Sequence, residues 1–265
     1  MKVKPEKPAL SSSVSGKRKR RSSRNKLTFL LLKIVVVLLA AVLVAAGIGR
    51  YRAGRSGDTI VVALDAAHDG DSYGAKGVID ESVFTDELVN AIEAELKKDS
   101  RFTVIRTHRS KQEAGVKRRV ETINAAAPDI LISVACESSG EDAAKKGTTI
   151  YADVPIQKTN AESLKFAAAM RECFSEIGIE APIAYYYYKP IGDTVFQPHI
   201  VDALDQTDYK EDTFTILQET KCPAVVIRQI DVTNQTDVET WANPSGYKKL
   251  AEAYAAALKR MYKTD

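Results

Sequence analysis

The sequence predicts an α/β domain with a mostly parallel sheet and helices on both faces, preceded by one transmembrane helix. From Thr59 onward, apolar runs of strand length alternate with amphipathic segments of helical period. This order favours parallel strands, because the helix after each strand carries the chain back to the start of the next. Runs such as 60–64 (IVVAL) are continuously apolar, which is typical of strands buried on both faces.

The individual strands and helices follow from these patterns. Apolar runs bounded by polar residues give the predicted strands: 60–64, 102–107, 130–135, 148–151 and 224–230. Segments of helical period give the predicted helices: 81–98, 116–126, 161–177 and 245–261. In the first helix, an apolar residue recurs at every fourth position from Phe84 to Leu96. Pro128 closes the second helix, Gly178 ends the third, and Ser245 caps the last.

Before Thr59 the chain is strongly basic and contains one long apolar run. Of the 38 Lys and Arg residues, 14 lie in residues 1–56 with a single acid, so that segment carries +13, the remainder −10 and the whole chain +3. Residues 27–49 have Lys33 as their only charge and, at about 1.5 Å per helical residue, can cross a hydrocarbon core about 30 Å thick. The basic run 17–26 directly precedes them, so the positive-inside rule keeps the N-terminus in the cytoplasm.

These features predict the domain organisation and the location. Residues 1–26 form a disordered basic cytoplasmic tail, 27–49 a transmembrane helix, 50–58 a linker and 59–265 an extracytoplasmic domain, so the protein crosses the cell membrane once. Two alternatives are open: cleavage of the apolar run as a signal peptide at Ala45-Ala46-Gly47, and nucleic-acid binding by the tail. Topology and anionic lipids already explain the basic tail, and the domain's charge of −10 argues against a nucleic-acid partner.

The cysteines give no sign of a disulfide framework. An exported domain held by disulfides usually has a denser, even set, whereas this chain has only Cys136, Cys173 and Cys222. Cys136 ends one predicted strand and Cys222 begins another, so parallel strands keep the two apart. All three are predicted to be small buried hydrophobic residues.

The loop after the first strand reads LDAAHDGDSYGAKGVIDES, from Leu64 to Ser82. It places a histidine near a strand tip, then a glycine-rich loop and a glutamate that opens a helix. This pattern resembles the type 3 N-acetylmuramoyl-L-alanine amidases, a family of zinc-dependent peptidoglycan hydrolases. The matching residues are Asp65, His68, Gly70, Gly74, Ala75, Gly77 and Glu81. Residues 107–133 and 213–234 resemble later stretches of the family, so the resemblance covers most of residues 59–262 and implies the family's α/β fold.

The resemblance also implies where a catalytic centre would lie. The family binds zinc through His, Glu and a second His, leaves a fourth position for water, and uses a further Glu as general base. His68 and Glu81 stand at the first two ligand positions, but Ala135 stands at the third and Arg228 at the general-base position. A methyl group cannot coordinate a metal, and a guanidinium cannot accept a proton. The resemblance therefore implies a degenerate zinc site, no bound cofactor and loss of the amidase reaction.

A rescued zinc site is the alternative. Glu137 lies two residues beyond Ala135, on the same face if the strand continues, whereas Cys136 faces the other way. Asp231 or another acid nearby would have to replace the general base. With both replacements, the chain would be an active, divergent zinc amidase that hydrolyses the MurNAc–L-Ala amide bond. A different reaction altogether is the remaining alternative.

Without a metal, the remnant residues have simpler interpretations. His68 is then a loop histidine hydrogen-bonded to a carboxylate, and the helix dipole alone favours Glu81 at a helix start. His108 and His199 are isolated in the sequence and are interpreted as surface or hydrogen-bonded residues rather than ligands.

A run of tyrosines, 185–188, is followed by Lys189 and Pro190. Aromatic faces stack on sugar rings while their hydroxyls form hydrogen bonds, so Tyr186 and Tyr188 are candidate substrate-binding residues. The alternative interpretation is a strand with alternate tyrosines buried.

The sequence therefore predicts a membrane-anchored, amidase-like domain that acts at the bacterial cell wall. In the favoured hypothesis it is a catalytically inactive pseudoenzyme that binds peptidoglycan or a cell-wall enzyme. In the second hypothesis it is the active divergent amidase. In the third it is a structural or assembly protein whose groove is vestigial.

Overall fold

The computed structural model describes residues 59–68, 74–109, 112, 114–140, 147–192 and 195–263. These residues belong to one compact unit, Asp58–Asp265. The predicted tail 1–26, transmembrane helix 27–49 and linker 50–58 lie outside the described residues. In the described part, no helix has both the length and the apolar character needed to span a membrane.

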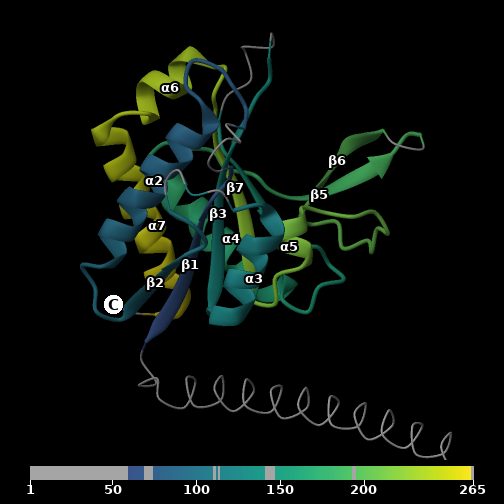
Figure 1. Ribbon diagram of the computed structural model, residues 1–265, viewed down its shortest axis with the longest axis horizontal. Coiled ribbons are helices and arrows are strands. Elements are labelled where there is room, and N and C mark those ends of the chain that lie inside the picture. Colours follow the sequence, from purple (N-terminus) through teal and green to yellow (C-terminus); the bar gives the residue numbers. More distant parts are fainter. Residues whose placement is uncertain are drawn as a thin grey trace, which may run out of the picture. The chain divides into compact units, whose positions relative to one another are not determined.

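The strands of the described residues form a single mixed sheet. They are β1 (Ile60–Ala66), β2 (Phe102–Arg106), β3 (Ile130–Glu137), β4 (Thr149–Ala152), β5 (Ile183–Pro190), β6 (Phe196–Asp202) and β7 (Ala224–Asp231). Their order across the sheet is β2-β1-β3-β7-β4-β5-β6 (Figure 1). Neighbours from β2 to β7 are parallel, as are β4 and β5, whereas β4–β7 and β5–β6 are antiparallel. The predicted α/β fold with a mostly parallel sheet is confirmed.

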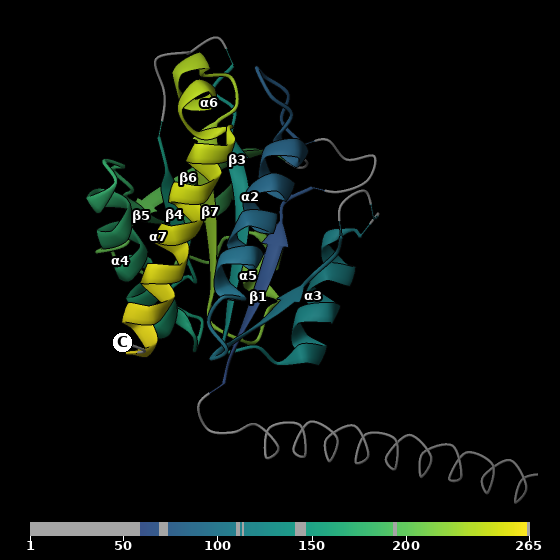
Figure 2. The same cartoon turned by 90° about the vertical axis from the view of Figure 1, so that its left-hand side faces the viewer.

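Helices cover both faces of this sheet, as predicted. They are α2 (Glu81–Leu96), α3 (Val116–Ala126), α4 (Asn160–Glu176), α5 (Thr215–Gln218), α6 (Gln235–Trp241) and α7 (Pro244–Tyr262). The helices α2, α4 and α7 bury their apolar residues in one core cluster with strand residues such as Leu64 and Ile227. The helices α3 and α5 pack on the opposite face, against Leu131 and Val226 (Figure 2). The strand ends that carry the candidate site lie between these layers.

Most element boundaries agree with the sequence prediction, and the differences have local causes. The last helix begins at Pro244, because the side chain of Asn243 accepts hydrogen bonds from the backbone N–H groups of Ser245 and Gly246. The predicted cap at Ser245 is therefore wrong. The elements β6, α5 and α6 were not predicted. All three cysteines are buried and free, as predicted.

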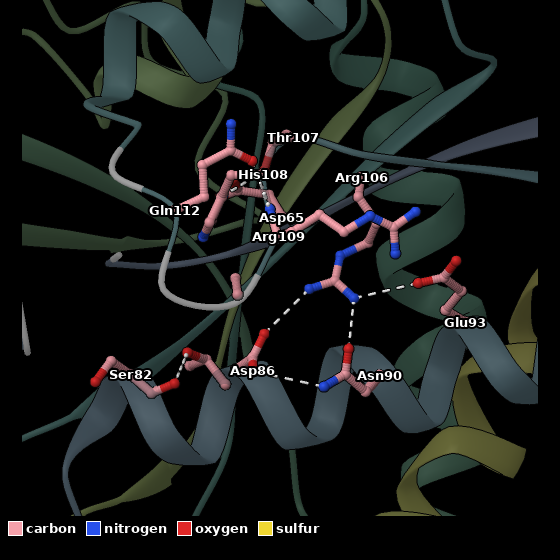
Figure 3. Close-up of polar contacts among 12 residues, drawn as sticks. Asp65, Ser82, Asp86, Asn90, Glu93, Arg106, Thr107, His108, Arg109 and Gln112 are labelled. Atoms are coloured by element: carbon pink, nitrogen blue, oxygen red, sulfur yellow. Dashed lines mark hydrogen bonds and ion pairs between the residues drawn. The ribbon is translucent and has the colours of Figure 1, made fainter. Parts of the chain in front are cut away.

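The edge strand β2 is fixed to helix α2 by one buried guanidinium. Arg106, the last residue of β2, lies 3.3 Å from carboxylate oxygens of both Asp86 and Glu93 and donates a 2.8 Å hydrogen bond to the Asn90 side chain (Figure 3). Only 4% of the Arg106 side chain is exposed. This anchoring sets the position of the next residue, Thr107, whose hydroxyl donates a hydrogen bond to the Asp65 carboxylate in the candidate site.

Candidate functional site

A cavity of about 620 Å³ lies at the carboxyl ends of β1, β3 and β7. In a parallel sheet this is where ligands bind, because loops from several strands converge there. Its lining includes residues from the loop after β1, the start of α2, the end of β3, the strand β5 and the segment that leads into α5. The predicted site residues His68, Glu81, Ala135, Glu137, Tyr186 and Arg228 all line it.

On the β1 side, the histidine and glutamate at the first two ligand positions lie side by side. His68 Nε2 is 3.3 Å from Glu81 Oε2, and Glu81 is buried. The same carboxylate accepts hydrogen bonds from the backbone N–H groups of Ala75 (2.9 Å) and Cys136 (2.8 Å). This contact brings together the two residues that the resemblance places at the first two ligand positions.

Gly74 is the residue that lets this pair form. Its φ angle is +67°, and a Cβ atom there would lie 2.5 Å from both Glu81 Oε2 and His68 Cδ2. Any side chain would therefore clash with the pair and also strain the backbone. The glycine of the sequence motif thus has a direct structural reason.

Next to the cavity, Asp65 and Arg119 form a buried ion pair. Asp65 is fully buried, and its carboxylate lies 2.8 Å from Arg119 Nη1. The same carboxylate accepts hydrogen bonds from the hydroxyls of Thr107 (2.6 Å) and Ser133 (2.7 Å). His108 Nδ1 lies 3.0 Å from the Thr107 hydroxyl (Figure 3), so this histidine is a buried, hydrogen-bonded residue rather than a ligand.

On the β3–β7 side, the residues at the third-ligand and general-base positions are neighbours across the sheet. Ala135 pairs with Arg228 in the strand register. The Arg228 guanidinium turns to Glu137, and its Nη1 atom lies 2.8 Å from each carboxylate oxygen. Burial would lower the pKa of Arg228, but the Glu137 carboxylate outweighs this and raises it. The acid proposed to replace the third ligand is therefore bound by the cation that replaces the base.

The other candidates for a rescued centre have different environments. Cys136 belongs to the apolar cluster on the opposite face of the sheet, and burial raises the pKa of its thiol well above the usual value. Asp231 is buried and accepts hydrogen bonds from the backbone and hydroxyl groups of Ser139 and Thr233. Burial alone would raise the pKa of Asp231, but these hydrogen bonds lower it overall. A carboxylate stabilised in this way is a weak general base.

The described residues do not fit a zinc ion at this place. A catalytic zinc needs three protein ligands, and His68 and Glu81 supply two. Among the residues the structure describes, no group of three or more His, Cys, Asp or Glu side chains could hold a metal. The Arg228 cation lines the same cavity and would also repel a dication there.

The tyrosine run lies in strand β5, and its alternate side chains lie on opposite faces of the sheet. Tyr185 and Tyr187 point into the large core cluster, whereas Tyr186 and Tyr188 line the cavity. Phe214 stacks on Tyr186, with ring centroids 4.3 Å apart. Phe214 was missed in the sequence, because a single aromatic residue in a loop carries no periodic signal. His199 lies outside the cavity lining, beside the rings of Tyr187 and Tyr209.

The fold and the cavity at its strand ends together define an α/β domain of hydrolase architecture. A family model described as N-acetylmuramoyl-L-alanine amidase matches residues 62–260, so the chain belongs to the type 3 family of these proteins. The comparison with curated proteins gives no match.

Solved structures of amidases share the fold. The catalytic domain of CwlV from Bacillus (Paenibacillus) polymyxa var. colistinus is 22% identical with a TM-score of 0.61, over 78% of this chain and 100% of that one. An amidase from Clostridium difficile 630 is 14% identical with a TM-score of 0.62, over 79% and 100%. The CwlD amidase from Clostridioides difficile, solved with the GerS lipoprotein, is 14% identical with a TM-score of 0.58, over 78% and 100%. At these identities the likeness establishes the fold.

Proposed function

We propose that this protein is a catalytically inactive amidase-fold domain that binds peptidoglycan in the cavity at its strand ends. It is anchored in the cell membrane by residues 27–49, with its N-terminus in the cytoplasm and its domain on the outer side. The observation that carries the proposal is the Arg228–Glu137 ion pair, at 2.8 Å, beside Ala135.

Ala135 and Arg228 stand in place of two groups that amide hydrolysis by this family requires. The reaction needs a metal-activated water and a base that takes its proton. At the third-ligand position a methyl group faces the cavity, and at the base position a guanidinium carries a permanent positive charge. Glu137, the nearest substitute for either role, has both oxygens bonded to Arg228.

Binding of a ligand requires neither group, and the cavity has the size and the aromatic lining for it. Its volume of about 620 Å³ lies in the range of ordinary ligand sites. Tyr188 and Phe214 are partly exposed and offer aromatic surface for a sugar ring or a peptide, whereas Tyr186 is buried and stacks on Phe214. Family membership makes peptidoglycan the natural ligand of this groove.

The test uses the full-length protein in lipid nanodiscs with zinc-containing buffer. We expect no stoichiometric zinc, no chelator-sensitive release of stem peptides from wall sacculi, and co-sedimentation with those sacculi. The triple variant Ala135→His, Glu137→Gln and Arg228→Glu restores the ligand and the base, so it serves as the positive control for zinc uptake. Stoichiometric zinc and chelator-sensitive release by the unmodified protein would establish the alternative, an active divergent amidase.

A cell-wall enzyme or another wall protein is the second candidate partner, and a different surface favours it. The β5–β6 hairpin projects from the body of the domain (Figure 1). Exposed apolar side chains lie along its outer half and just after it: Ile191, Val195, Phe196, Ile200 and Leu204. Patches of this kind mark protein contacts. The neighbour CwlD was solved with a lipoprotein, which gives a precedent for partner binding on this fold.

The two candidates are separated by where substitutions act. Phe196→Ser on the hairpin would weaken a protein contact and leave sacculus binding unchanged. Tyr188→Ser in the cavity would weaken sacculus binding. If neither substitution changed co-sedimentation or partner recovery, the groove would be vestigial, as in the third hypothesis.

A further inference from the structure

We infer that the cavity recognises a free carboxylate on a short peptide, and that Arg228 is the residue that binds it. The inference rests on the proposed function of this cavity and names the carboxylate as the chemical group that the cavity binds. The residue at the general-base position has thus become a cation that binds an anion.

The guanidinium of Arg228 has one edge engaged and one edge open. Glu137 contacts only Nη1. Among the described residues, Nε and Nη2 of Arg228 have no hydrogen-bond partner. Neither atom is fully buried, so both are accessible. Arg228 lines the 620 Å³ cavity, and 21% of its side chain is exposed. The Nε–Nη2 edge of an arginine matches the two oxygens of a carboxylate.

Aromatic rings fix the orientation of this open edge. The Arg228 Cζ atom lies 5.2 Å from the ring centroid of Tyr186, 5.4 Å from that of Phe214 and 5.5 Å from that of Tyr151. Cation–π contacts on this scale hold the guanidinium plane without using its hydrogen-bond donors. Little rotational freedom is then lost when a carboxylate binds.

Partial burial makes the interaction stronger than at an open surface. Only 21% of the Arg228 side chain is exposed. Charge-assisted hydrogen bonds strengthen where water is partly excluded. Glu137 neutralises part of the charge, and its own side chain, 31% exposed, can accept from a ligand N–H group. A carboxylate and an amide N–H close together are the polar groups of a peptide.

The rest of the cavity lining limits the ligand to a small, partly apolar molecule. The lining includes the uncharged Tyr188, Pro198 and Ile216 as well as the polar residues His68, Glu81 and Arg119. The volume suits a few linked residues rather than a folded partner. Stem peptides of the cell wall, attached to the glycan or released from it, carry free carboxylates and fit this description.

The experiment compares a free acid with its amide on the full-length protein in nanodiscs. The probe is the synthetic peptide L-alanyl-γ-D-glutamyl-L-lysyl-D-alanine, with both carboxylates free or with both converted to carboxamides. Affinities are measured by isothermal titration calorimetry. We expect the free acid to bind about tenfold or more tightly than the amide, as a two-bonded guanidinium contact predicts.

Variants assign this preference to the residue. Arg228→Lys keeps the positive charge beside Glu137 but loses the two-pronged edge, so the preference should fall below about threefold. Arg171→Lys on the exposed face of α4 is the matched control and should keep it. If Arg228→Lys proved unfolded by circular dichroism, the comparison of acid and amide in the unmodified protein would still decide.

The remaining outcomes separate this inference from the proposed function. Equal affinity for acid and amide, no peptide binding, or a preference retained in Arg228→Lys overturns the inference, and wall binding stands if sacculi still sediment the protein. Loss of both peptide and sacculus binding overturns the proposed function as well. The same preference in a peptide linked to N-acetylmuramic acid assigns the ligand to the intact wall. A preference confined to the free peptide assigns it to released stem peptides.

Discussion

The two sides of the cavity differ in how much of the family's pattern they keep. The β1–α2 side retains His68, Glu81 and the glycine that makes room for them. On the β3–β7 side, Ala135 and Arg228 pair at the positions where the resemblance places the third ligand and the general base. The sheet runs through both sides without interruption, so the two sides share one scaffold.

Each side also contains one guanidinium–carboxylate pair, and the two pairs differ in burial. In the Asp65–Arg119 pair, the side chains are 0% and 11% exposed, and two hydroxyls complete the hydrogen bonding. In the Glu137–Arg228 pair, they are 31% and 21% exposed. We interpret the first pair as part of the fold and the second as part of a binding surface.

The largest effect is expected from breaking the buried pair. Arg119→Met leaves the Asp65 carboxylate buried without its cation, which typically costs about 3–5 kcal/mol of unfolding free energy. Urea denaturation of purified residues 58–265, followed by circular dichroism, measures it. Arg118→Met, on the exposed face of the same helix, is the matched control and should change stability by less than about 0.5 kcal/mol. A loss of under 1 kcal/mol at Arg119 would show that Asp65 is not a structural anchor.

A buried carboxylate without a cation gives the complementary test. Asp153 is fully buried at the end of β4, and its carboxylate accepts a 3.2 Å hydrogen bond from the Ala224 N–H. Burial raises the pKa of Asp153 to about 7, although hydrogen bonds from Thr159 and Ala224 oppose it. Between pH 4 and 7 the folded state therefore holds a proton that the unfolded chain has released.

Stability should accordingly fall as the pH rises through this range and become level above about pH 7. Asp153→Asn removes the proton linkage, so the variant should gain relative to the unmodified domain, by an amount on the order of 2–4 kcal/mol at pH 8. Paired urea titrations at pH 5 and pH 8 measure the difference. If the gap between the two proteins were the same at both pH values, the Asp153 carboxylate would have an ordinary pKa in the folded state.

The sequence predicted the retained side of the cavity better than the altered side. The helix stripe and the glycine motif place Glu81 beside His68 through contacts close in sequence. The Arg228–Glu137 pair joins residues on different strands, and β7 carries an extra residue between Arg228 and Asp231 relative to β3. Such a bulge re-aims side chains near sites, and no sequence period reveals it. The strand β6 was missed because most of its residues are exposed, including Phe196 and Ile200.

The smallest effect on stability is expected from the Glu137–Arg228 pair. The coupling energy of this pair decides whether Arg228 serves the fold or a ligand. A double-mutant cycle with Glu137→Gln, Arg228→Gln and the double variant should give a coupling energy on the order of 1–2 kcal/mol, below that of the Asp65–Arg119 pair, because both side chains keep some contact with water. The double variant should fold normally and yet lose the preference for a free carboxylate. A coupling energy near that of the Asp65–Arg119 pair would make Arg228 a structural residue. The replacement of the catalytic base would then have served the stability of the fold rather than the recognition of a ligand.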